Sequence, residues 1–182
     1  MGAIQNYGQV SKLSKACKTV LYSMVQSKYF IPACLTAAFL IRICWIYVVD
    51  AQPVSDFIFY YERGIDLSAS RGYSQNGAPT AYWPVGYPAF LGFLFTAFGP
   101  SLFIAKIANI ILYMGVLLFS YYIARKLFRS ESTARITLLI LSFYPNHLAY
   151  SSLLASEILF LFLLQLGLLL LTRDVIVFWH VS

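Results

Sequence analysis

The sequence predicts an all-α membrane protein with about four transmembrane helices and a short interfacial helix in the first extracytoplasmic loop. Of its 182 residues, 60% are hydrophobic and 11% are charged, whereas an average soluble domain has roughly 45–50% apolar and about 25% charged residues. Apolar runs close to the roughly 20 residues that span a bilayer alternate with short polar segments. Basic residues gather at the N-terminus and between these runs, which indicates membrane topology and disfavours a nucleic-acid partner.

The two longest apolar runs give the first two predicted spans. The first covers 29–49 and is interrupted only by Arg42, and the second covers 101–128. Lysines precede the first run and a basic cluster closes the second, so the positive-inside rule puts both of these ends in the cytoplasm. Residues 50–100 are therefore expected on the extracytoplasmic side. Within them, the apolar stretch 86–99 is too short to cross and is predicted as an interfacial or re-entrant helix.

The later apolar stretches predict two further spans. We expect an outward third helix over 135–144, a bent extracytoplasmic turn over 145–152 and an inward fourth helix over 153–172. Arg135 and Arg173 then both lie on the cytoplasmic side, as the charge rule requires.

Three regions follow from this pattern. Residues 1–28 form a basic cytoplasmic segment, 29–173 form the transmembrane region, and 174–182 are expected to be a tail, the start of a further element that is cut short. The polar, lysine-bearing start has no short apolar core of the kind found in secretory signal peptides. We therefore expect an integral membrane protein whose N-terminus is cytoplasmic.

Arg42 lies inside the first predicted span, where a charge costs at least about 2.5 to 3.5 kcal/mol on insertion scales. Two interpretations stand. Its long side chain snorkels toward the outer interface, or its guanidinium contacts the phosphate of a lipid that enters from the membrane.

Three acids flank the predicted outer ends of the helices. Asp50 and Asp56 follow the first span, and Glu157 lies near the outer end of the fourth. A carboxylate at the membrane surface can remove a proton from an acceptor, or hold a divalent metal beside a phosphate leaving group. The alternatives are solvated loop acids for the first two, and for Glu157 an acid favoured by the dipole at a helix start.

Residues 72–88 are rich in glycine, proline and aromatic residues, including Tyr82 and Tyr87. Aromatic belts at the membrane interface explain these side chains without a ligand, and stacking on a sugar ring is the alternative. His147 and His180 stand alone without metal-ligand spacing and are expected to be structural. The three cysteines have the spacing of neither a disulfide framework nor a zinc site.

Taken in chain order, these features resemble the membrane glycosyltransferases of the GT-C superfamily, in the branch of the protein O-mannosyltransferases and aminoarabinose transferases. The match is to a series of short motifs over about residues 35–173. The series consists of Arg42, Asp56, Tyr60, Gly72-Tyr73, the stretch 79–88, Phe98-Gly99, the stretch 124–128, Pro145, Ser156 and Glu157.

The resemblance implies transfer of a sugar from a polyprenyl-phosphate donor to a lipid, glycan or protein acceptor on the extracytoplasmic side of the inner (plasma) membrane. It implies Asp56 as the catalytic acid of the first outer loop, with Glu157 as a second. Arg42, Asp50, Tyr60, Tyr82 and Tyr87 are then the candidate substrate-binding residues. The sugar, the acceptor and any divalent metal are left open.

Two departures limit this resemblance. A Lys-Pro-Pro of the lipid A-modifying members is replaced by Trp83-Pro84-Val85, which removes a lysine contact to the donor phosphate unless Arg42 takes its place. The relatives also continue through more spans, so this chain is expected to be an N-terminal portion that is inactive alone.

The alternative is a small non-catalytic membrane protein that binds lipid or assembles with a larger complex. A transporter is disfavoured because we find no proton-relay residue deep within a span.

Overall fold

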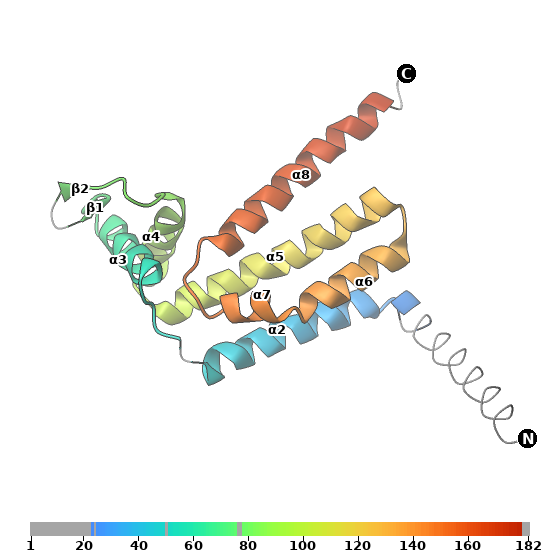
Figure 1. Ribbon diagram of the computed structural model, residues 1–182, viewed down its shortest axis with the longest axis horizontal. Helices are drawn as coiled ribbons and strands as arrows, with labels where there is room; N and C mark the ends of the chain where they lie inside the picture. The colour runs from blue at the N-terminus through green and yellow to red at the C-terminus, as the bar shows by residue number, and fades with distance from the viewer. Residues whose placement is uncertain (1–22, 24, 50, 76–77, 180–182) are drawn as a thin grey trace, which may run out of the picture.

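The computed structural model describes residues 23, 25–49, 51–75 and 78–179, and these residues are mostly helical (Figure 1). In chain order the elements are α2 (Phe30–Val48), α3 (Asp56–Ser68), β1 (Ser74–Gln75), β2 (Ala78–Pro79), α4 (Gly86–Phe98), α5 (Leu102–Phe128), α6 (Glu131–Ser142), α7 (Pro145–Tyr150) and α8 (Glu157–Trp179). The axes of α2, α5, α6 and α8 are roughly aligned, and the chain direction alternates from each of these helices to the next (Figure 1). Helices α3 and α4 and both strands gather at one end, which we call the hairpin end, and α5 passes into α6 at the opposite, basic end.

Among the described residues, α2 and α5 are long and apolar enough to cross a membrane, with 19 and 27 residues. At 1.5 Å per residue, α2 is about 28 Å long, close to the roughly 30 Å of a bilayer's hydrocarbon core. Helix α4 and the apolar part of α8, Glu157–Leu171, are shorter. The helices predicted at 29–49, 86–99 and 101–128 are therefore confirmed, whereas crossing by four helices stays a prediction.

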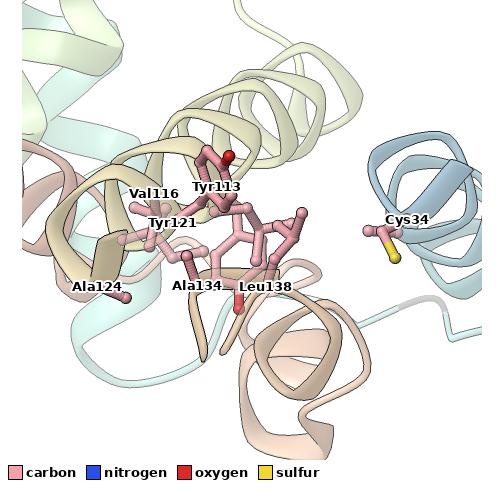
Figure 2. Close-up of a cluster of buried hydrophobic side chains, with 10 residues drawn as sticks. Cys34, Tyr113, Val116, Tyr121, Ala124, Ala134 and Leu138 are labelled. Atoms are coloured by element: carbon pink, nitrogen blue, oxygen red, sulfur yellow. The ribbon is translucent and has the colours of Figure 1, made fainter. Parts of the chain in front are cut away.

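The main core lies between α2, α5 and α6, and α8 also packs on α5. Figure 2 shows side chains of α5 and α6 meeting there, with Cys34 contributed by α2. Small residues on the facing helices let the backbones approach closely, which is how helices associate inside a membrane. The buried members of this core are Cys34, Ala38, Tyr113, Val116, Leu117, Tyr121, Ala124, Ala134, Leu138 and Ile158.

At the hairpin end, α3 and α4 pack against each other through two glycines. A Cβ added to Gly64 would lie 2.8 Å from the Cβ of Leu91, and one added to Gly92 would lie 2.9 Å from the Cβ of Leu67. The strands pair in antiparallel register, with Ser74 opposite Pro79. The close contact of α3 with α4 therefore depends on both positions lacking a side chain.

At the basic end, a group of paired charges joins α5 to α6. We call Arg125, Glu131, Arg135 and the hydroxyl of Tyr121 the Glu131 cluster. The Glu131 carboxylate accepts hydrogen bonds from Tyr121 and from Arg135, each at 2.7 Å, and it lies 3.1 Å from Arg125 Nε. Arg135 also donates to the backbone carbonyl of Ser27, so the cluster ties the start of α2 to α6.

The third and fourth helices differ in their limits from those expected. Helix α6 begins at Glu131, not residue 135, because the Ser130 hydroxyl accepts a hydrogen bond from the backbone N–H of Thr133. The turn expected over 145–152 contains the short helix α7. Helix α8 begins at Glu157 and continues to Trp179, so it enters the segment 174–182 that was expected to be a separate tail. Helix α3 was not expected at all.

Candidate functional site

Two clefts open beside the first turn of α8. The α4–α8 cleft has a volume of about 420 Å³ and takes Tyr60 from α3 and Tyr87 from α4. The α7–α8 cleft has a volume of about 400 Å³ and takes Tyr113 from α5 and His147 from α7. Both are lined by Glu157 and Phe160. The other lining residues are Pro84, Gly86, Ser156, Leu159 and Leu163 in the first cleft, and Tyr144, Asn146, Tyr150, Ile158 and Leu161 in the second.

Glu157 is the first residue of α8, and its side chain is exposed. The partial positive charge at a helix N-terminus favours a carboxylate at this position. The helix dipole explains why an acid is stable there, and among the described residues no hydrogen bond or ion pair engages the Glu157 carboxylate. Glu157 therefore offers a hydrogen-bond acceptor to both clefts.

The far wall of the α4–α8 cleft is aromatic. The rings of Tyr60 and Tyr87 meet edge to face with centroids 5.6 Å apart, and Tyr60 makes a similar contact with Trp83 at 6.4 Å. The Tyr87 hydroxyl donates to Asn109 at 3.1 Å. Burial raises the pKa of Tyr87, and the nearby Glu157 carboxylate adds to the increase despite the opposing Asn109 contact. Tyr87 is therefore a neutral phenol at physiological pH.

Arg42 is completely buried among α2, α5 and α6, so it neither snorkels nor faces a lipid phosphate. Its Nη1 donates to the carbonyl of Ala38 at 2.9 Å and to that of Ser142 at 3.0 Å. The guanidinium carbon lies 4.1 Å from the centroid of the Tyr113 ring, which is a cation–π contact. Its Nε and Nη2 atoms have no hydrogen-bond partner in the described residues.

Arg42 and Tyr113 supply hydrogen-bond donors to backbone carbonyls at the end of α6. Pro145 has no N–H to continue the helix, and the carbonyls of Leu141 and Ser142 lie at the last turn. Tyr113 donates to Leu141 at 3.0 Å and Arg42 donates to Ser142. A cation is also favourable at the negative end of a helix dipole. Arg42 therefore has a structural explanation at the break between α6 and α7.

The remaining predicted site residues lie away from the two clefts or outside the described residues. Asp56 begins α3, is half-buried and accepts a hydrogen bond from the Ser55 hydroxyl at 3.0 Å, but it lines neither cleft. Tyr82 is 76% exposed and touches the edge of Trp83. Asp50 lies outside the described residues. The structure thus brings together Glu157, Tyr60 and Tyr87, and it does not bring Asp56 to them.

Sequence reasoning missed His147 as part of a site. His147 Nδ1 lies 2.6 Å from the Tyr113 hydroxyl, and its ring contacts both Tyr113 and Tyr144. The spacing of 34 residues between Tyr113 and His147 gives no local signal that could have revealed the pair. Among the described residues, no three His, Cys, Asp or Glu side chains form a group that could hold a metal ion.

Comparison with family models, with curated proteins and with solved structures finds no match to this chain.

Proposed function

We propose that this chain is the N-terminal membrane region of a glycosyltransferase that moves a sugar from a polyprenyl-phosphate donor to an acceptor on the extracytoplasmic side. The observation that carries the proposal is the position of Glu157, which lines two clefts of similar volume. A transferase needs one acidic group within reach of a donor and an acceptor. The ordered motif series that resembles the GT-C superfamily supplies the substrate class.

In this proposal the chain crosses the inner (plasma) membrane four times, through α2, α5, the pair α6–α7 and α8. A helix that breaks within a membrane needs partners for its freed backbone groups. The donors that Tyr113 and Arg42 offer to the last carbonyls of α6 meet that need. The basic end then faces the cytoplasm, and the hairpin end with its clefts faces outward.

The reaction is a single displacement at the anomeric carbon of the donor sugar. The acceptor oxygen forms a bond to the anomeric carbon. At the same time the bond between the anomeric carbon and the phosphate oxygen breaks, and polyprenyl phosphate leaves with the electron pair. A carboxylate takes the proton of the acceptor. Glu157 is our first candidate for that role because of its position between the clefts, and Asp56 is the candidate that the resemblance implies.

The aromatic wall of the α4–α8 cleft suits a lipid-linked sugar. Tyr60 and Tyr87 are largely buried but belong to the lining of the cleft, and the apolar residues Leu159 and Leu163 continue that lining along α8. A mostly apolar cleft with a few polar groups is the usual form of a small-ligand site. We assign the donor to this cleft. Arg42 is assigned to the support of α6, without contact to the donor phosphate.

Donor binding by the chain in lipid nanodiscs tests the proposal. The probe is a polyprenyl-phosphate mannose that carries a photoreactive diazirine on the sugar, and labelled peptides are mapped by mass spectrometry. We expect labels on Tyr60, Tyr87 or Phe160, and we expect unlabelled polyprenyl-phosphate sugars to compete while phosphatidylglycerol does not. Labels spread along the outer faces of the helices, without competition, would contradict the proposal and favour a non-catalytic lipid-binding protein.

A further inference from the structure

The hydrogen bonds of Tyr113 determine which nitrogen of His147 carries a proton. A tyrosine hydroxyl has one hydrogen to donate. Tyr113 donates it to the carbonyl of Leu141 at 3.0 Å, and a carbonyl can only accept. The contact of 2.6 Å between the same hydroxyl and His147 Nδ1 therefore needs the hydrogen on Nδ1. The lone pair of the neutral imidazole then lies on Nε2.

His147 Nε2 is available to a ligand. Within the described residues it has no hydrogen-bond partner, and it is not among the buried atoms that lack one. His147 and the exposed Glu157 both line the α7–α8 cleft. The cleft thus has two hydrogen-bond acceptors in its lining, one from α7 and one from α8.

The surroundings of His147 favour the neutral ring. Arg42 from α2 packs on the ring of Tyr113, and Tyr113 contacts His147, so a charge on the imidazole would lie near a second cation. Tyr144 and Tyr150 flank the cleft with neutral aromatic rings. Glu157 is the one acid that lines this cleft among the described residues, and it is exposed to solvent.

We propose that the α7–α8 cleft binds a hydroxyl-bearing sugar or polyol, whose hydroxyl hydrogens are accepted by His147 Nε2 and by Glu157. Two acceptors in the lining of one cleft match a ligand that carries several hydroxyl donors, and the aromatic rings of the cleft can cover its apolar face. The assignment of this cleft to the acceptor rests on the proposed function. Arg42 and Tyr113 act as positioning residues because they hold His147 in the required tautomer.

Protection of His147 from diethyl pyrocarbonate tests this binding site directly. The reagent acylates accessible, unprotonated imidazole nitrogens, and a His180→Asn background leaves His147 as the chain's one histidine. The chain is held in nanodiscs, and the modified peptide is quantified by mass spectrometry with and without millimolar methyl mannoside or methyl glucoside. We expect His147 to be modified and at least one of the two sugars to slow that modification severalfold. No modification, or modification that neither sugar slows, would overturn the proposal.

Two substitutions separate ligand binding from a purely structural role. His147→Asn keeps a donor at the position of Nδ1 and removes the acceptor in the cleft, whereas His147→Gln keeps a polar group at the position of Nε2 and gives up the donor to Tyr113. The readout is binding of a tritiated sugar, with thermal stability measured in parallel. We expect the Asn variant to stay as stable as the parent and to lose sugar binding. Unchanged binding by the stable Asn variant would contradict the proposal.

The sugar site and the proposed function can be disproved independently of each other. Sugar binding in the α7–α8 cleft needs no lipid-linked donor and no transfer step. Protection of His147 without competed labelling by the polyprenyl-phosphate probe would sink the transferase proposal alone. Competed donor labelling without protection of His147 would sink the proposed hydroxyl site alone.

Discussion

Two charged groups of the helical bundle, Glu131 and Arg42, have different kinds of partner. At the basic end, Glu131 is paired with Arg125 and Arg135. Toward the hairpin end, Arg42 is buried with carbonyl oxygens and an aromatic ring as its partners, and no carboxylate of the described residues pairs with it. The Glu131 cluster is complete in itself and explains only how helices are joined. The contacts of Arg42 continue through Tyr113 to His147 and hence to a cleft.

The difference between these partners indicates where in the bundle a ligand-binding group should lie. A charge whose partners are all satisfied within the fold needs no ligand to explain it. Glu157 and His147 line the α7–α8 cleft, whereas Glu131 at the basic end has its carboxylate oxygens engaged by three donors. Substitutions at the two ends should therefore affect different properties.

The largest expected effect is on sugar transfer. Glu157→Gln keeps the shape of the side chain and removes the base, so we expect transfer to fall at least about 100-fold, the lower limit for general acid–base catalysis. Transfer is measured in membranes, on the protein extended to the length that the resemblance implies. Asp56→Asn is measured beside it, and Glu62→Gln, an exposed acid on α3, is the control. Full activity of the Glu157→Gln variant would remove this residue from the mechanism.

The next effect compares two arginines. Arg42→Met leaves the carbonyl of Ser142 without its donor, and because hydrogen bonds to charged groups contribute about 1.5–3 kcal/mol, we expect a stability loss of about 2 kcal/mol. Arg125→Met removes an ion pair whose arginine is 58% exposed, so the loss should stay below about 1 kcal/mol. Denaturation in detergent measures both. Equal losses would contradict the distinction between the buried Arg42 and the exposed Arg125.

A smaller effect tests the packing of the hairpin end. Gly92→Ala forces a Cβ to within 3.3 Å of the Gly64 carbonyl oxygen and 2.9 Å of Leu67, so α3 and α4 must move apart. Overpacking of this kind costs about 1–3 kcal/mol. Gly86→Ala on the same helix meets nothing within 4 Å and is the matched control. If thermal unfolding found both variants alike, the close approach of α3 and α4 would be wrong.

The smallest effect is a pH dependence at the basic end. The hydrogen bond from Tyr121, together with the contacts of Arg135 and Arg125, lowers the pKa of Glu131 against an opposing effect of burial. A carboxyl whose pKa is lower in the folded state stabilises the fold above its unfolded pKa, and this contribution is lost as the pH falls through the folded pKa. The contribution should be below about 1 kcal/mol because the side chain is part-exposed.

Unfolding midpoints of the wild type and of Glu131→Gln, followed from pH 7 downward, measure this contribution. We expect the wild type to be more stable at pH 7 and the difference to vanish below the normal carboxyl range, around 4.5. A difference that grows on acidification would have the opposite sign and would refute the pairing.

The long helices could be predicted from the sequence because their signal is local. Long, mostly apolar runs marked α2 and α5, and glycines and prolines bounded α4. Helix α3 escaped prediction because it mixes apolar and charged residues, and its apolar face is explained only by α4 packed against it. The start of α6 was misplaced because the capping role of Ser130 was overlooked.

The candidate site could be predicted only in part, since its contacts join distant segments. Glu157, Tyr60 and Tyr87 were chosen from the sequence and do meet at one cleft. The burial of Arg42 depends on the Ser142 carbonyl, which is 100 residues away. His147 was expected to be structural, and its contact with Tyr113 joins residues 34 positions apart. No spacing rule within one segment could have supplied either contact.

The membrane orientation of the hairpin end is the claim on which the transferase proposal depends, and cysteine labelling tests it most directly. In a cysteine-free background, Ser70→Cys lies after α3 and Lys126→Cys lies in the last turn of α5, and both positions are exposed. With a membrane-impermeant maleimide on intact cells, we predict labelling of Ser70→Cys at once and of Lys126→Cys only after permeabilisation. Labelling of Lys126→Cys in intact cells, with Ser70→Cys protected, would place both clefts in the cytoplasm and contradict the account.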